Sequence, residues 1–451
     1  MKWQAVLASV AIFPPFMWWL VPDIQPRQAA SEQTMTIAAY GPRHIFQAIK
    51  SGNTDLIVVG DSQSTYSADR GQEGLMRHLQ PREWCGRVWP AAPESAESGT
   101  RTLGPVAPGS GGSIAMETAT SDTDAQSKWS PRNYYEITFS GDFGNSSRMM
   151  SSLHAYDLAS GDYKGVDPFI GERLVGWSIH RASNATEKII NGRYRNGFYV
   201  GTVLQGSLVN TDIGTGLGME AGVKNYLAAG DYASGDAGDE NLEFRVTGGA
   251  GGDETGDYIQ FAGSVVHRVN ADNSRANGLV LGACARSGMD ASEWNTNAAQ
   301  AVWQRWFGAT DTGADQTVIM VMLGHNTETA GTFADNLDTL LTRLYAAFVA
   351  DRGVAPMFLL VAPWESDQVE QMTSGRNDTI KGYTGSGTPI GDVSVVSLWE
   401  AFGAADPGMV GLHPGDNTEL ALIYGELWDQ INYGPAKDGR RVRPRDIYRK
   451  R

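Results

Sequence analysis

Short aliphatic runs that end abruptly in polar turns lie near the beginning and in the last third of the chain. The first run is Leu56–Val59, and four more lie within GLVLGAC (278–284), QTVIMVMLG (316–324), APMFLLVAP (355–363) and DVSVVSLW (392–399). Continuous apolar runs of this length are typical of parallel strands that are covered on both faces. We therefore expect these segments to form a buried parallel sheet.

Helical periodicity accompanies these strand candidates. The segment 332–353 places six apolar residues on one face, with Thr332 as the expected N-cap and Gly353 as the expected stop. These six are Phe333, Leu337, Leu340, Leu341, Leu344 and Phe348. Two more helix candidates are 417–431, with Leu420, Ile423, Leu427 and Ile431 in register, and 69–80, with Leu75, Met76 and Leu79. Alternating strands and helices predict a doubly wound α/β domain.

The middle of the chain differs in composition and in its pattern of apolar residues. Residues 91–122 are rich in Gly, Ser, Ala and Pro, which favours an irregular loop or linker. Four β-type segments follow between Gly, Asp and Asn turns, namely 134–141, 197–209, 241–249 and 257–269. This spacing predicts a β-sandwich or jelly roll that forms a separate unit. We expect it to span 91–274 and to interrupt an α/β domain formed by 51–90 and 275–432.

The two ends of the chain carry distinct signals. Residues 1–30 combine Lys2, a long apolar stretch and small residues near Ala30, as in a secretory signal or a membrane anchor. A buried helix is the alternative, and Pro14 and Pro15 disfavour it. Residues 433–451 form a basic tail, which is either solvated or in contact with an acidic surface. The net charge of -15 argues against a nucleic-acid partner.

Cysteine and histidine usage gives no sign of a metal site. Cys85 and Cys284 are the only two cysteines, and they form either two free thiols or one bridge. His154, His180 and His267 lack the spacing of metal ligands, so we expect structural or surface roles for them. We predict neither a metal nor a cofactor.

Four short motifs carry the candidate chemistry. They are GDSQS (60–64), RSGMD (286–290), LGHN (323–326) and GLHPGD (411–416), in that order. The first three follow or overlap a strand candidate, and the last precedes a helix candidate. No G-x-S-x-G elbow occurs, so the common α/β-hydrolase arrangement is not indicated. In these motifs the chain resembles the SGNH (GDSL-like) hydrolase family, whose four sequence blocks centre on Ser, Gly, Asn and His.

The resemblance covers roughly 51–90 and 275–432 and implies a three-layer α/β/α, flavodoxin-like domain. It implies that Ser62 is the nucleophile and His413 its general base. It also implies that the backbone N–H groups of Ser62 and Gly288 and the side chain of Asn326 form the oxyanion hole.

Two features depart from the family pattern. Thr327 follows Asn326 where the family usually has Asp, and His325 lies between Gly324 and Asn326. The catalytic acid normally lies three residues before the histidine, and that position is Val410. Asp406 is our first candidate for the acid, because Pro407 and Gly408 allow its loop to fold back. Weaker alternatives are Asp416, Glu400 or a Ser–His dyad with no acid.

The resulting expectation is an exported serine esterase that acts on O-acetylated carbohydrate or a small ester without a cofactor. Some polysaccharide deacetylases of this broad family carry a β-sandwich between the first and second blocks, which is similar to the layout here. Aromatic residues in 162–180 stack on sugar rings or belong to the core. Acyl transfer by the same residues is one alternative, and a non-catalytic carbohydrate-binding protein is the other.

Overall fold

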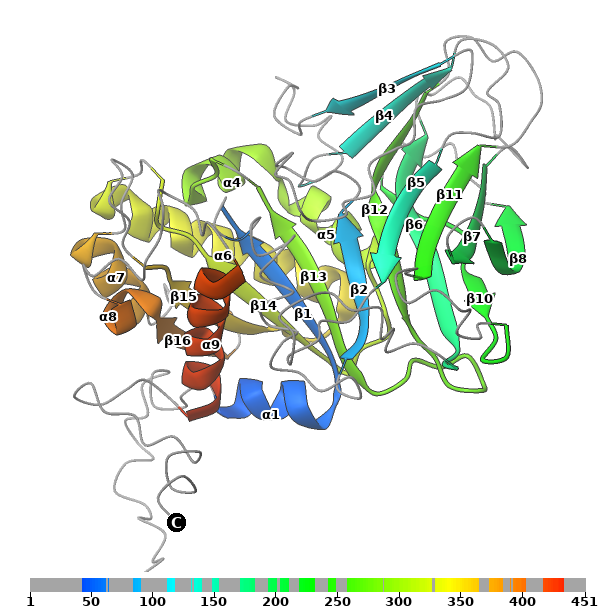
Figure 1. Ribbon diagram of the computed structural model, residues 1–451. Helices are drawn as coiled ribbons and strands as arrows, with labels where there is room; N and C mark the ends of the chain where they lie inside the picture. The colour runs from blue at the N-terminus through cyan, green and yellow to red at the C-terminus, as the bar shows by residue number, and fades with distance from the viewer. Residues whose placement is uncertain are drawn as a thin grey trace, which may run out of the picture.

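The computed structural model describes the main secondary-structure elements of the chain (Figure 1). The described residues are 43–61, 64, 84–90, 112–117, 131, 134–139, 148–153, 171–182, 194–200, 203–210, 219–231, 242–248, 258–286, 288–326, 329–364, 373–383, 390, 392–402 and 417–433. The predicted helix at 69–80, the predicted signal or anchor at 1–30 and the tail at 433–451 lie outside these residues, apart from position 433.

A parallel sheet forms the centre of the molecule. Strand β1 (Asn53–Gly60) lies between β13 (Gly278–Ala285) and β14 (Gln316–Met322), and β15 (Met357–Ala362) and β16 (Val393–Ser397) continue beyond β14. All five are parallel, which confirms the strands expected from the aliphatic runs. Counted along the chain, their order is 2-1-3-4-5, the order of a flavodoxin-like sheet.

Each face of this sheet is covered by helices, as Figure 1 shows. Leu56 and Val58 of β1 share a core cluster with residues of α1 (Arg43–Ser51) and α9 (Asn417–Tyr433). Ile57 and Val59 point to the opposite cluster, which includes residues of α4 (Ala291–Asn297), α5 (Gln300–Ala309), α6 (Ala330–Arg352) and α7 (Ser374–Lys381). Alternate residues of one strand therefore enter two cores, giving three layers.

The two predicted helices inside the described residues are confirmed, with one correction. All six apolar residues predicted for α6 are buried, and Ile423, Leu427 and Ile431 of α9 are buried as well. Gly353 ends α6 at φ 70°, and its N–H donates to the Val349 carbonyl. The N-cap is Thr329 rather than Thr332, because α6 begins earlier and Thr332 lies in its first turn, where its hydroxyl donates to the Thr329 carbonyl.

Strand β2 and several strands of the predicted insertion extend the central sheet. Strand β2 (Trp84–Pro90) pairs in parallel with β13, and β12 (Tyr258–Arg268) pairs antiparallel with β2. Beyond β12 the sheet continues through β6 (Leu174–Ala182) to β10 (Asn225–Leu227), while β9 (Glu220–Ala221) pairs with β6. A branch from β12 consists of β4 (Tyr134–Phe139) and β3 (Gly112–Glu117).

A second, antiparallel sheet packs on this extension. Its strands are β5 (Arg148–Leu153), β11 (Leu242–Gly248), β7 (Tyr194–Val200) and β8 (Val203–Asn210), in that order. Gly176 of β6 faces the rings of Phe198 and Phe244 so closely that an added Cβ would lie 2.7 Å from Phe244. The two sheets therefore meet face to face.

Two expectations for this region need correction. Residues 112–117 lie inside the predicted linker, but they form β3. Small and apolar residues alternate in this segment, and it pairs antiparallel with β4. The expected separation of the insertion is also absent among the described strands, since β12 hydrogen-bonds to β2 across the predicted boundary. The limits of the predicted domains themselves stay a prediction.

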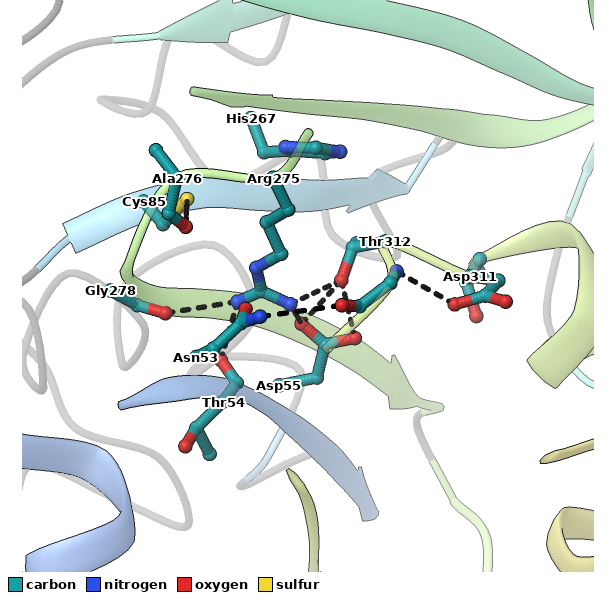
Figure 2. Close-up of polar contacts among 12 residues, drawn as sticks. Asn53, Thr54, Asp55, Cys85, His267, Arg275, Ala276, Gly278, Asp311 and Thr312 are labelled. Atoms are coloured by element: carbon teal, nitrogen blue, oxygen red, sulfur yellow. Dashed lines mark hydrogen bonds and ion pairs between the residues drawn. The ribbon is translucent and has the colours of Figure 1, made fainter. Parts of the chain in front are cut away.

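A buried polar cluster joins three segments at the amino end of the central strands (Figure 2). The Arg275 guanidinium donates to the Asp55 carboxylate at 2.6 Å and to the carbonyls of Thr54 and Gly278 at 2.8 and 2.9 Å. The Thr312 hydroxyl donates to the same carboxylate at 2.8 Å. The cluster ties β1 to the segments that precede β13 and β14.

The remaining sequence expectations concern cysteine, histidine and aromatic residues. Cys85 and Cys284 are buried thiols that form no disulfide, and burial raises the pKa of Cys85. His180 and His267 are buried in β6 and β12, while His154 lies outside the described residues. Trp177 is a core residue whose indole N–H donates to the Ala309 carbonyl at 2.9 Å, so it does not stack on a sugar.

The described residues contain neither a membrane-spanning helix nor a cluster of metal ligands. None of the described helices is long and apolar enough to cross a membrane. Within the same residues, no cluster of three or more His, Cys, Asp or Glu side chains could hold a metal ion.

Candidate active site

Three of the four sequence motifs follow adjacent strands of the parallel sheet. The first follows β1, the second follows β13 and the third follows β14, and these strands are neighbours. The strand order reverses between β1 and β14, and open α/β sheets bind ligands at the carboxyl ends of strands beside such a reversal. Ser62, His413 and Asp406 lie outside the described residues, so the site is described through the residues around them.

Gly60 ends β1 in a position that has no room for a side chain. A Cβ there would lie 2.0 Å from the Ser64 hydroxyl oxygen and 2.6 Å from the Met322 carbonyl oxygen. The Gly60 carbonyl accepts from the Arg286 backbone N–H at 3.1 Å and from the Trp294 indole N–H at 3.3 Å. The requirement for glycine in Gly-Asp-Ser thus arises from close packing between β1 and β14.

The turn after Gly60 is held from both sides. The Ser64 backbone N–H donates to the Asp61 carbonyl at 3.0 Å, and its hydroxyl donates to the Met322 carbonyl at 3.4 Å. Asp61 and Ser64 are both fully buried. These two residues flank positions 62 and 63 in the sequence.

The second and third motifs meet at Met289. Gly288 has φ +74°, which favours glycine, and it is exposed to solvent. The Asn326 side-chain amide donates to the Met289 carbonyl at 2.6 Å, so Asn326 lies beside the residue that follows Gly288. An Asn amide has two N–H donors, and this bond uses one of them. The structure therefore places Asn326 beside the Gly288–Met289 segment, which holds another of the three residues assigned to the oxyanion hole.

His325, a residue of the third motif, has a buried side chain. Its Nε2 bonds to the Trp364 carbonyl at 2.6 Å, and its Nδ1 lies 3.9 Å from the Asp61 carboxylate. Both side chains are almost completely inaccessible to solvent, at 1% for His325 and 0% for Asp61. The histidine that departs from the family pattern thus contacts the Asp that precedes Ser62.

Arg376 adds a positive charge to this buried region. It lies on α7, is 6% exposed, and its guanidinium donates to the Gly324 carbonyl. Gly324 has φ +134°, a conformation that L side chains rarely adopt. Sequence reasoning did not assign Arg376 or Trp364 to the site, because each comes from a segment without a motif of its own.

The fourth motif lies between two described helices. Glu400, a weaker candidate for the acid, lies on α8 (Leu398–Phe402), where its carboxylate binds the Lys381 ammonium group. The Gln430 side chain of α9 pairs with both backbone groups of Ser397, at 2.9 and 2.8 Å. These bonds fix α9 to the end of β16. His413, Asp406, Val410 and Asp416 all fall between α8 and α9, outside the described residues.

No protein-family model and no curated protein matches the chain. Among solved structures, the chain is similar to a peptidoglycan O-acetylesterase, at 10% identity and a TM-score of 0.47 over 88% of this chain and 98% of that one. It is also similar to family two carbohydrate esterases from Cellvibrio japonicus (9% identity, TM-score 0.25) and Clostridium thermocellum (11%, 0.27). The latter two matches cover 71% of this chain and 95% and 98% of those chains.

Proposed function

We propose that the chain is a serine esterase that removes O-acetyl groups from carbohydrate through an acyl-enzyme intermediate. The observation that carries this proposal is the meeting of the three motifs at the carboxyl ends of β13, β1 and β14. The first motif, which lies more than 200 residues before the other two in the sequence, meets them at the edge where this sheet is expected to bind a ligand.

The proposed reaction begins when His413 takes the proton from the Ser62 hydroxyl as its oxygen attacks the ester carbonyl. The Ser62 and Gly288 N–H groups and the Asn326 amide stabilise the oxyanion. His413 then gives its proton to the leaving sugar oxygen, and Ser62 keeps the acetyl group as an ester. A water molecule, deprotonated by His413, attacks this ester and releases acetate, while the proton returns to Ser62. Asp406 is the proposed partner of His413.

The substrate class and the location rest on the sequence. The resemblance to the SGNH family, with a β-rich insertion between its first two blocks, supports an acetylated carbohydrate. The apolar segment at 1–30 supports export or anchoring at the cell surface.

Hydrolysis of p-nitrophenyl acetate by the full chain tests the proposal, with Ser62→Ala and His413→Ala measured beside it. We expect turnover by the parent and loss of nearly all activity in both variants. Ser64→Ala is measured beside them, because it removes the buried hydroxyl that holds the same turn to the Met322 carbonyl; it should retain more activity than Ser62→Ala, which removes the nucleophile. Activity that is equal in the parent and in Ser62→Ala contradicts the proposal.

Product analysis separates the esterase from its two rivals. Release of free acetate from an acetylated polysaccharide indicates hydrolysis, whereas transfer of acetyl to an added oligosaccharide indicates an acyltransferase. Val410, at the usual position of the catalytic acid, is the feature that favours a non-catalytic binding protein. Binding of polysaccharide without any Ser62-dependent turnover would establish that reading.

A further inference from the structure

We propose that Asp61 and His325 are positioning residues that hold one proton between them and thereby fix Ser62 relative to Asn326. The inference rests on the proposed function for its catalytic part. Neither side chain belongs to the nucleophile, the base or the oxyanion hole as assigned above. Each is the immediate sequence neighbour of a residue that is, because Asp61 precedes Ser62 and His325 precedes Asn326.

The two residues follow the ends of two neighbouring strands. Asp61 follows β1 and His325 follows β14, and the distance from Asp61 Oδ2 to His325 Nδ1 is 3.9 Å. This distance is longer than a hydrogen bond and short enough for an ion pair. With 0% and 1% exposure, the pair lies in a region where water screens the attraction poorly.

The second ring nitrogen of His325 determines what the first can do. The Trp364 carbonyl can only accept a hydrogen bond, so Nε2 must carry a proton to make its 2.6 Å contact. A neutral ring would then direct the Nδ1 lone pair at a carboxylate, which is repulsive. A proton on Nδ1 turns this repulsion into attraction and leaves both ring nitrogens acting as donors. We therefore assign an imidazolium to His325 and a carboxylate to Asp61.

Two described basic residues contact the backbone next to this pair. Arg376 of α7 binds the Gly324 carbonyl, one residue before His325, and the 7% exposed Arg286 follows β13. The Arg376 guanidinium lies against the residue before His325 and disfavours a further positive charge on the His325 ring. The Asp61 carboxylate is accordingly the group that makes the imidazolium stable, and without it the proton should leave Nδ1.

Two other buried histidines provide the contrast. The Nδ1 atom of His180 forms a hydrogen bond with the Ser178 hydroxyl, and the Nδ1 atom of His267 forms one with the Arg268 carbonyl. Burial lowers the pKa of these two rings to about 4 and about 3. Among the three, His325 has a carboxylate oxygen at 3.9 Å from a ring nitrogen.

Nitrogen NMR of the full chain with ¹⁵N-labelled histidine tests the proton directly. At pH 7 we expect both ring nitrogens of His325 to carry protons in the parent, and Nδ1 to lose its proton in Asp61→Asn. The His325 signals are assigned through their connection to the Asn326 backbone, so the parent alone is informative even if a variant fails to fold. A neutral His325 ring in the parent overturns the proposal, as does a protonated ring that Asp61→Asn leaves unchanged.

Kinetics tests the positioning role. Asp61→Asn and His325→Gln should each lower kcat roughly tenfold with KM unchanged, and the double variant should be no slower than the slower single variant. The rate at which a fluorophosphonate labels Ser62 should fall in parallel. His180→Gln is the matched control, since it makes the same change at a buried ring of β6 and should leave kcat unchanged. The positioning role is overturned if the decrease in kcat follows the decrease in thermal stability in every variant, His180→Gln included. It is also overturned if the decrease in kcat of the double variant equals the product of the two single decreases.

The two experiments fail in different ways. If Ser62→Ala hydrolyses ester as fast as the parent, the proposed function fails, and the NMR result still decides whether Asp61 and His325 hold a common proton. If Ser62 is essential but Asp61→Asn and His325→Gln keep the parental kcat, the proposed function stands and the positioning role fails.

Discussion

The Cα atom of Gly60 faces the Ser64 side chain and the Met322 carbonyl with no space between them for a methyl group. This contact explains why an aliphatic strand ends in glycine immediately before Asp61 and Ser62. It also sets the distance between the carboxyl ends of β1 and β14, where the motifs meet.

Replacing Gly60 by alanine should disrupt this contact. A Cβ at 2.0 Å from the Ser64 hydroxyl oxygen and 2.6 Å from a backbone oxygen forces the strands apart, so we expect a loss of about 1–3 kcal/mol in the free energy of unfolding. Gly331→Ala is the control, because its Cβ meets no atom within 4 Å, and α6 should gain about 0.5–1 kcal/mol. Urea unfolding of both variants measures this, and equal stabilities would contradict the packing argument.

Replacing Arg275 by methionine should be costly for a different reason. The change leaves the Asp55 carboxylate buried without its counter-charge, so we expect a loss of about 3–5 kcal/mol in urea unfolding. Lys381→Met removes one partner of the exposed Lys381–Glu400 pair and should cost less than about 1 kcal/mol. Equal effects of the two substitutions would show that burial of the Arg275 pair is unimportant.

Buried neutral histidines should make the fold sensitive to acid. The pKa values of His180 and His267, about 4 and about 3 in the folded chain, lie below the ordinary 6.5, first of all because burial removes water. Between the folded pKa and 6.5, each ring is therefore protonated in the unfolded chain and neutral in the folded one. The free energy of unfolding is highest above pH 6.5 and decreases as the pH falls through this window. Each ring contributes a decrease of about 1.4 kcal/mol per pH unit in that window.

The histidine contribution can be isolated by substitution. His180→Gln should flatten the dependence of unfolding free energy on pH between 6.5 and about 4, measured by urea unfolding at a series of pH values. His267→Gln should extend the flattening to about pH 3. A slope identical to that of the parent would mean that these rings take up protons in the folded chain.

Thiol chemistry should report the state of the two cysteines. Cys85 and Cys284 are buried thiols without a disulfide, so we expect no reaction with Ellman's reagent in the folded protein. Unfolding in urea without a reductant should release two reactive thiols per chain, and Cys85→Ala should release one. Absence of reactive thiols in the unfolded parent would indicate a disulfide bridge.

Sequence patterns predicted the parallel strands well, because strands buried on both faces consist of uninterrupted aliphatic residues. Leu56–Val59 and the four later runs are all strands of the sheet. The helix ending at Gly353 was equally clear, since one apolar face and a glycine stop are local features. The start of that helix was placed three residues late, because Thr329 and Thr332 are both acceptable caps in sequence terms.

Features that depend on distant partners could not be predicted. WCGRVWP gave no clear periodicity, and it is a strand because β13 and β12 lie on either side of it. The contact of Asp61 with His325 likewise joins residues from two motifs and became visible only in three dimensions. Ser62, His413 and Asp406 stay predictions.

The order in which strands enter the sheet also affects how this chain folds. Strand β1 is made early, yet both of its neighbours are synthesised later, and the Asp55–Arg275 bond that anchors it spans 220 residues. Closing such a loop is slow because its entropic cost precedes the contacts that reward it. During translation β1 therefore has neither of its neighbouring strands until β13 and β14 have been synthesised. Until then its aliphatic residues are exposed, and exposed strands of this kind are prone to aggregate unless chaperones bind them.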